Sequence, residues 1–269
     1  MTQQNRIDRR FARLREEGRK ALVTYLVAGD GGPENTVPLM HQLVASGSDL
    51  IELGVPFSDP MAEGPVIQRG HERALEFRTS LRQCLEMVRE FRREDSDTPV
   101  ILMGYANPIE RMGAERFADA ALEAGVDGAL TVDLPAEEAG PLSDLLRARN
   151  LRNIFLLTPT TSEERIQAIT RLASGFVYYV SLKGVTGAGN LDPQAVRENL
   201  GRIRRFTDLP LCVGFGIKDG ASARAVSEAG DGAVVGSVLV SAIGEARDGA
   251  AARDAVAEIT GEIRTALDA

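Results

Sequence analysis

The segment Ser46-Gly47-Ser48-Asp49-Leu50-Ile51-Glu52-Leu53-Gly54 joins a helical pattern to a short apolar strand pattern. The same kind of joint returns at Ala124-Gly125-Val126-Asp127-Gly128-Ala129 and at Ala229-Gly230-Asp231-Gly232-Ala233-Val234. Glycine suits the left-handed position after a helix, and the short polar residue turns the chain into the sheet. We interpret the three joints as a weak internal repeat of helix–strand units.

Outward from these joints, short β-rich runs alternate with helical patterns along the chain. The strand candidates are Ala21–Ala28, Leu50–Gly54, Val100–Gly104, Ala129–Val132, Ile154–Leu157, Phe176–Ser181, Leu211–Gly214 and Ala233–Gly236. The helix candidates are Thr36–Ala45, Leu81–Arg92, Ala114–Ala124, Glu137–Arg149, Glu163–Leu172, Pro193–Arg205, Ala221–Ala229 and Ala251–Leu267. Such alternation is typical of parallel βαβ units.

An additional amphipathic helix, from about Ile7 to Glu17, precedes the first strand. No low-complexity linker divides the 269 residues, so we expect residues 1–269 to form one domain. Eight units of this size predict an α/β fold, a single (β/α)8 TIM barrel with an extra N-terminal helix, whose chemistry lies at the carboxyl ends of the strands. A doubly wound open sheet is the alternative.

Composition excludes several classes of partner and site. The net charge of −8 argues against nucleic acid and against an anionic membrane surface, which both favour basic proteins. No signal peptide and no apolar run of membrane length are seen, so a cytoplasmic protein is expected. Cys84 and Cys212 lie in apolar segments and are expected to be reduced. His41 and His71 are the only histidines, which is too few for a His-rich metal site, and no metal is expected.

Glu52 is the first candidate for chemistry because it lies within an apolar strand. Burying a carboxylate without a partner costs roughly several kcal/mol, so such a residue is usually paired or functional. Glu63 follows on a Pro/Gly-rich acidic loop that we expect to run to Gly70 and to fold back over the strand end. Two carboxylates in different environments can hold different protonation states at one pH, as acid–base catalysis requires.

The segments after the seventh and eighth strand candidates indicate an anion site. Barrels often bind phosphate with backbone N–H groups of these two loops and of a short helix N-terminus. Here the segments are Gly214-Phe215-Gly216-Ile217 and Gly236-Ser237, although both glycines are also compatible with simple tight turns. Neither a Walker sequence nor the dinucleotide fingerprint is present, which favours a small phosphorylated molecule.

Several apolar side chains follow different strands and are expected to line one pocket. They are Tyr25, Tyr105, Leu130, Tyr178 and Phe215. Taken singly, such side chains belong more often to the core than to a pocket. Together with the anion site and the two carboxylates, they predict a substrate with a flat aromatic head and a phosphate tail. The Gly-rich segment from Lys183 to Asn190 has the composition of a lid.

The same segments resemble the signature of the tryptophan synthase alpha subunit family, in register along nearly the whole chain. The matching motifs are Glu52-Leu53-Gly54-Val55-Pro56-Phe57-Ser58-Asp59-Pro60, Gly64-Pro65, Gly104-Tyr105-Ala106-Asn107-Pro108, Val132-Asp133-Leu134-Pro135, Tyr178-Tyr179-Val180-Ser181, Gly184-Val185-Thr186-Gly187, Gly214-Phe215-Gly216-Ile217 and Gly236-Ser237.

This resemblance implies a lyase that cleaves indole-3-glycerol phosphate to indole and glyceraldehyde 3-phosphate, without a cofactor in this chain. Glu52 matches the carboxylate that protonates indole C3 and then accepts the side-chain hydroxyl proton. Glu63 lies where the family carries an aspartate that binds the indole N–H, one methylene shorter. Thr186 matches a lid threonine. Gly187, Gly216, Gly236 and Ser237 match the phosphate site, and Tyr25, Tyr105, Leu130, Tyr178 and Phe215 match pocket positions.

The resemblance also implies a partner. The family works in an α2β2 complex whose β subunit holds pyridoxal phosphate and receives indole through a tunnel. Asp59 and Pro60 fall on the loop expected to touch that subunit.

Two other functions are compatible with the residues. One is a class I aldolase in which Lys183 forms a Schiff base, since a desolvated lysine is nucleophilic. The other is a non-catalytic subunit that presents a ligand to a partner.

Overall fold

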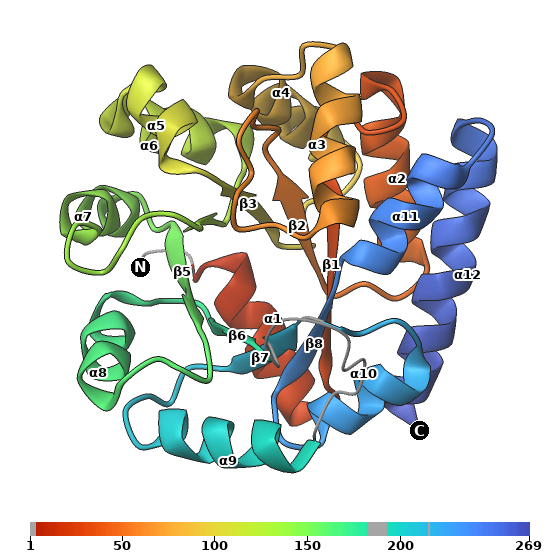
Figure 1. The fold of residues 1–269 in the computed structure, drawn as a ribbon. Helices are drawn as coiled ribbons and strands as arrows, with labels where there is room; N and C mark the ends of the chain where they lie inside the picture. Colours follow the sequence, from red (N-terminus) through yellow and green to blue (C-terminus); the bar gives the residue numbers. More distant parts are fainter. Residues whose placement is uncertain (1–3, 182–192, 215) are drawn as a thin grey trace.

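The computed structural model describes residues 4–181, 193–214 and 216–269, and its strands form a closed barrel (Figure 1). All neighbouring strands are parallel, and β8 pairs with β1 to close the barrel. The strands are β1 (Ala21–Val27), β2 (Leu50–Gly54), β3 (Val100–Gly104), β4 (Gly128–Thr131), β5 (Arg152–Leu157), β6 (Val177–Val180), β7 (Leu211–Gly214) and β8 (Gly232–Val235). This confirms the predicted (β/α)8 barrel and excludes the open sheet, and each predicted strand end is within two residues of the observed one.

The helices surround this barrel (Figure 1). They are α1 (Arg6–Glu16), α2 (Pro33–Ala45), α3 (Pro65–Glu76), α4 (Leu81–Phe91), α5 (Ala106–Met112), α6 (Ala114–Ala124), α7 (Gly140–Ala148), α8 (Glu163–Leu172), α9 (Pro193–Arg204), α10 (Gly220–Ser227), α11 (Ser237–Glu245) and α12 (Gly249–Asp268). Every predicted helix is present, with its ends within three residues. No helix in the described ranges has the length and apolarity needed to cross a membrane.

Three helices were not predicted, namely α3, α5 and α11, and all begin near the carboxyl ends of strands. The expected loop as far as Gly70 is therefore wrong in its second half, because α3 begins at Pro65. Proline suits the first helical turn, where its missing N–H needs no partner and its fixed φ is already helical. Figure 1 shows α3 and α11 beside each other near β1, and the two helices are in contact.

The barrel interior is filled by alternate residues of the strands. In β2, Leu50 points inward while Ile51 and Leu53 pack outward against the helices, so the parity of the strand also turns Glu52 inward. At the amino end, α1 closes the barrel with buried apolar side chains, and Phe11 packs against Phe176 with ring centroids 5.7 Å apart. The cavity at the other end of the barrel is lined by apolar side chains together with Glu52 and Glu63.

The aspartates of the repeated joints have a common structural role. Each accepts a hydrogen bond from a backbone N–H at the start of the preceding strand and also pairs with an arginine. The backbone contacts are Asp49 with Leu22 at 2.9 Å, Asp127 with Val100 at 2.9 Å and Asp231 with Leu211 at 2.7 Å. The arginines are Arg264, Arg92 and Arg204, respectively. These contacts hold adjacent strands in register at the amino end of the barrel.

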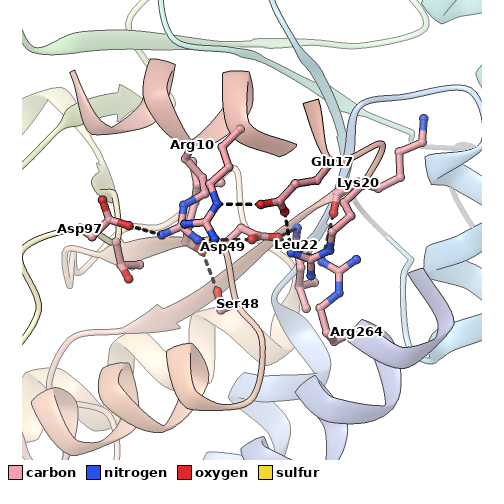
Figure 2. Close-up of polar contacts among 12 residues, drawn as sticks. Arg10, Glu17, Lys20, Leu22, Ser48, Asp49, Asp97 and Arg264 are labelled. Atoms are coloured by element: carbon pink, nitrogen blue, oxygen red, sulfur yellow. Dashed lines mark hydrogen bonds and ion pairs between the residues drawn. The ribbon is translucent and has the colours of Figure 1, made fainter. Parts of the chain in front are cut away.

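Figure 2 shows the first of these aspartates among its partners. Asp49 lies 3.0 Å from a guanidinium nitrogen of Arg264 in α12 and 3.5 Å from one of Arg10 in α1. Arg264 also donates to the backbone carbonyl of Lys20, immediately before β1. The network therefore ties the first and last helices of the chain to the strands where the barrel closes.

We expect Asp127→Ala to lower the free energy of unfolding by about 3 kcal/mol, because it leaves the largely buried Arg92 guanidinium without its carboxylate and the Val100 N–H without its acceptor. Urea unfolding measures the change. The control is Asp144→Ala, whose side chain is 74% exposed in its pair with Arg147 and should change stability by no more than about 0.5 kcal/mol. Equal effects of the two substitutions would contradict the role given to Asp127.

Candidate active site

A cavity of about 60 Å³ opens among the carboxyl ends of the strands. Its walls contain seven of the residues predicted for the site: Tyr25, Glu52, Glu63, Tyr178, Gly216, Gly236 and Ser237. Four further residues line it and were missed: Ile67, Met103, Ile217 and Val234. Met103 and Val234 are inward positions of β3 and β8, so counting strand parity from Glu52 through the neighbouring strands would have found them.

Glu52 is fully buried, and among the described residues neither of its carboxylate oxygens has a hydrogen-bond partner. Burial in this apolar setting raises its pKa to about 8, and the nearby Glu63 carboxylate adds to the increase. At neutral pH the side chain therefore retains its proton in most molecules. A carboxylic acid with this pKa can both give and take a proton near pH 7.

Glu63 reaches the same cavity from the turn that precedes α3. Burial raises its pKa to about 7, so it loses its proton more readily than Glu52 does. The turn is held in place by the Gln68 amide, which donates to the Glu63 carbonyl at 2.9 Å, and by the Ala62 N–H, which donates to the Tyr105 hydroxyl at 3.0 Å. The site thus contains two carboxyl groups with unequal proton affinities.

Two tyrosines of the cavity depend on glycines at the ends of neighbouring strands. A Cβ atom on Gly54 would overlap the hydroxyl group of Tyr25, and one on Gly214 would overlap that of Tyr178. Only glycine lets the rings lie across these strand ends. Burial and the two nearby glutamates raise the pKa of both tyrosines well above the usual value, so both hydroxyls keep their protons.

The predicted anion site lies on the same cavity wall. Gly216 has a φ of 76°, which favours glycine, and Gly236 is the N-cap of α11, with Ser237 as its first residue. The backbone N–H groups at a helix N-terminus attract anions through their dipoles. The cavity therefore has an acidic side at Glu52 and Glu63 and a phosphate-compatible side at α11.

The remaining predicted residues lie elsewhere or are not described. Tyr105 is buried beside the cavity rather than in its wall, and its ring stacks on Phe57 with centroids 4.9 Å apart. Leu130 belongs to the interior core of the barrel. Three predicted site residues, Thr186, Gly187 and Phe215, lie outside the described residues, as does Lys183 of the aldolase alternative.

Within the described parts of the chain, no group of three or more His, Cys, Asp or Glu side chains is arranged to hold a metal ion. Cys84 and Cys212 are both buried and free, as expected. The polar side chains that line the cavity are the carboxyl groups of Glu52 and Glu63 and the hydroxyl groups of Tyr25, Tyr178 and Ser237.

Comparison with known proteins identifies the family. A family profile described as Tryptophan synthase alpha chain matches residues 11–267. The chain belongs to this family. The tryptophan synthase alpha chain of Thioalkalivibrio sulfidiphilus is 62% identical over 237 residues, which are 88% of this chain and 89% of the relative. That of Marinobacter nauticus is 58% identical over 236 residues, 88% of this chain and 87% of the relative.

Solved structures agree with this assignment. The crystal structure of tryptophan synthase subunit alpha from Legionella pneumophila superposes with a TM-score of 0.91 at 46% identity and covers 99% of both chains. A structure of Mycobacterium tuberculosis tryptophan synthase gives a TM-score of 0.88 at 35% identity, covering 98% of this chain and 99% of that chain. The family resemblance of the motifs is thereby confirmed, and so is the enzyme class, a lyase.

We expect Glu52→Gln to stabilise the protein increasingly as the pH rises from 5 to 8.5. The unfolded chain releases the Glu52 proton near the ordinary pKa of 4.5, whereas the folded chain holds it until about 8. Between these values the native state binds more protons, so rising pH costs the parent up to about 1.4 kcal/mol per unit. Glutamine carries no such cost.

Urea unfolding of the parent and Glu52→Gln at pH 5 and pH 8.5 measures this difference. Glu123→Gln, on the exposed surface of α6, is the matched control for the loss of one glutamate. A stability difference between parent and Glu52→Gln that is the same at both pH values would contradict the raised pKa.

Proposed function

We propose that this chain cleaves indole-3-glycerol phosphate to indole and glyceraldehyde 3-phosphate in the cavity described above. The observation that carries the proposal is the pair of carboxyl groups in one largely apolar cavity, one of them buried without a partner among the described residues. Family membership supplies the reaction, and the cavity provides the groups that it needs.

Glu52 is the proton carrier in this proposal. With a pKa of about 8 it enters the reaction as an acid and gives its proton to indole C3, which makes the ring an electron acceptor. The resulting carboxylate takes the proton from the hydroxyl on the carbon attached to C3. The electrons of that O–H bond form the aldehyde, the bond between the two carbons breaks, and its electrons restore the indole. Glu52 ends the cycle protonated.

Glu63 is the partner of the ring nitrogen. Protonation at C3 places a positive charge on the indole nitrogen, and a carboxylate that accepts the N–H hydrogen bond stabilises that charge. Glu63 has the lower pKa of the two acids, about 7, so it is the one more available as an anion at neutral pH. The neutral Tyr25 and Tyr178 rings would contact the indole.

The other parts of the proposal concern residues around the cavity. Gly216, Gly236 and Ser237, with Gly187, would bind the phosphate, and Phe215 would join Tyr105 and Leu130 around the ring. Thr186 would reach the second acid from a lid. The proposal needs no cofactor in this chain and is consistent with a cytoplasmic enzyme formed by a single barrel domain.

A β subunit that holds pyridoxal phosphate is the proposed partner, in an α2β2 complex. Support comes from the alpha-chain name of the relatives and from the exposed loop between β2 and α3. Met61 at the tip of this loop is 84% exposed, next to Asp59 and Pro60.

Glu52→Gln should reduce the kcat for indole formation by at least about a hundredfold, because glutamine can neither give nor take the proton. Indole release by the purified chain, with and without a cognate β subunit, measures the effect. Indole formation by the parent also excludes the non-catalytic alternative. Full activity of Glu52→Gln would contradict the role of this residue.

Glu63→Asp should maintain or raise kcat, because the resemblance places the shorter acid at this position and about 1 Å of displacement can change a rate on the order of a hundredfold. Glu63→Ala should lower kcat strongly, because the cationic ring loses its counter-charge. Both are measured in the same indole assay. A Glu63→Ala variant with the parent kcat would remove Glu63 from the mechanism.

A further inference from the structure

His71 is a buried polar side chain of α3 that the mechanism above does not use. It is 2% exposed and sits one helical turn after Ile67, which lines the cavity. Its Nδ1 lies 3.1 Å from the backbone nitrogen of Phe57, and its Nε2 lies 3.3 Å from the hydroxyl oxygen of Tyr25. One imidazole therefore joins the loop that carries Glu63 to a tyrosine of the cavity wall.

The contact with Phe57 fixes the tautomer of this imidazole. A backbone N–H can only donate, so the Nδ1 that faces it must be unprotonated and accept. The proton of the neutral ring is then on Nε2, which faces Tyr25. Burial supports the neutral form because it lowers the pKa of His71 to about 4.

The tautomer in turn sets the direction of the Tyr25 hydroxyl. The hydroxyl hydrogen of a tyrosine lies near the ring plane and can point to either side of the C–O bond. When the oxygen accepts a hydrogen bond from one side, its own hydrogen points to the other side. Tyr25 lines the cavity and is the register partner of Glu52 in the pairing of β1 with β2, whereas His71 is not part of the cavity wall. The hydroxyl hydrogen is thereby directed away from the His71 imidazole.

We infer that His71 is a positioning residue that donates its Nε2–H to Tyr25 and so keeps the Tyr25 hydroxyl as a hydrogen-bond donor toward the cavity shared by Glu52 and Glu63. This role rests on the proposed function, since the donor serves the substrate and the acids in that cavity. Without His71 the hydroxyl can rotate and its hydrogen can point away from the reacting groups.

The tautomer can be tested without any assay of activity. The chain has only two histidines, so a sample with ¹⁵N-labelled histidine gives two sets of ring signals. At pH 7 we expect His71 to show a proton on Nε2 and none on Nδ1. Tyr25→Phe should shift the Nε2 signal of His71 and leave His41, which packs on Phe91, unchanged. A proton on Nδ1, or on both nitrogens, would overturn the inference.

A double-mutant cycle on indole formation then tests the function. His71→Asn places an amide oxygen near the position of Nδ1, so it keeps an acceptor for the Phe57 N–H while it loses the donor to Tyr25. We expect His71→Asn and Tyr25→Phe each to lower kcat about fivefold, the effect of one hydrogen bond, with little change in KM. The double variant should lose no more than either single variant.

If the two effects on kcat multiply in the double variant, His71 does not act through Tyr25. The same conclusion follows if His71→Asn keeps the parent kcat while Tyr25→Phe lowers it. If His71→Asn does not fold, His71→Gln, which retains an amide donor at the distance of Nε2, should retain most of the parent kcat, and its loss would overturn the inference. If the parent chain makes no indole, the proposed function is refuted. The histidine spectra would still show whether His71 donates its Nε2–H to Tyr25.

Discussion

The burial of the Glu52 carboxyl group inside an apolar barrel is the constraint on which the site depends. A carboxyl group in such a place is stable only if it keeps its proton or meets a counter-charge. The described residues of the cavity wall include no lysine, arginine or histidine, and the nearest charge is a second acid. A cation at any of these positions would lower the pKa of Glu52 and remove the acid from the proposed reaction. The neutral tyrosines and the neutral His71 are consistent with the same requirement.

The acidic residues at the two ends of the barrel differ in whether they have charged and hydrogen-bonding partners. At the amino end, Asp49, Asp127 and Asp231 each have an arginine and a backbone N–H as partners, and α1 seals the interior beside them. At the carboxyl end, Glu52 has no such partner among the described residues. Stability is therefore concentrated where no chemistry occurs, which lets the fold tolerate a costly carboxyl group where chemistry is needed.

Much of this arrangement can be predicted from sequence because it follows local rules. Strand parity turns Glu52 inward, and the alternation of strands and helices places the residues after each strand at one end of the barrel. The prediction was wrong for helix α3, because a Pro/Gly-rich segment reads as a loop although proline also starts helices. Tyr105 and Leu130 lie outside the cavity wall, and position after or near a strand end does not show where a side chain points. Tyr105 instead supports the loop through Ala62, and Leu130 fills the core.

Helix α3 links the loop that carries Glu63 to the wall of the cavity. Glu63 lies two residues before the helix begins, the first turn brings Ile67 to the cavity, and His71 in the second turn contacts Phe57 in the loop and Tyr25 in β1. The loop is anchored independently through Tyr105. Because hydrogen bonds hold the backbone around Glu63, the position of its carboxyl group depends on the rotamer of the side chain. Helix α3, one of the three helices that a strict alternation of strands and helices omits, thus couples the second acid to the barrel wall.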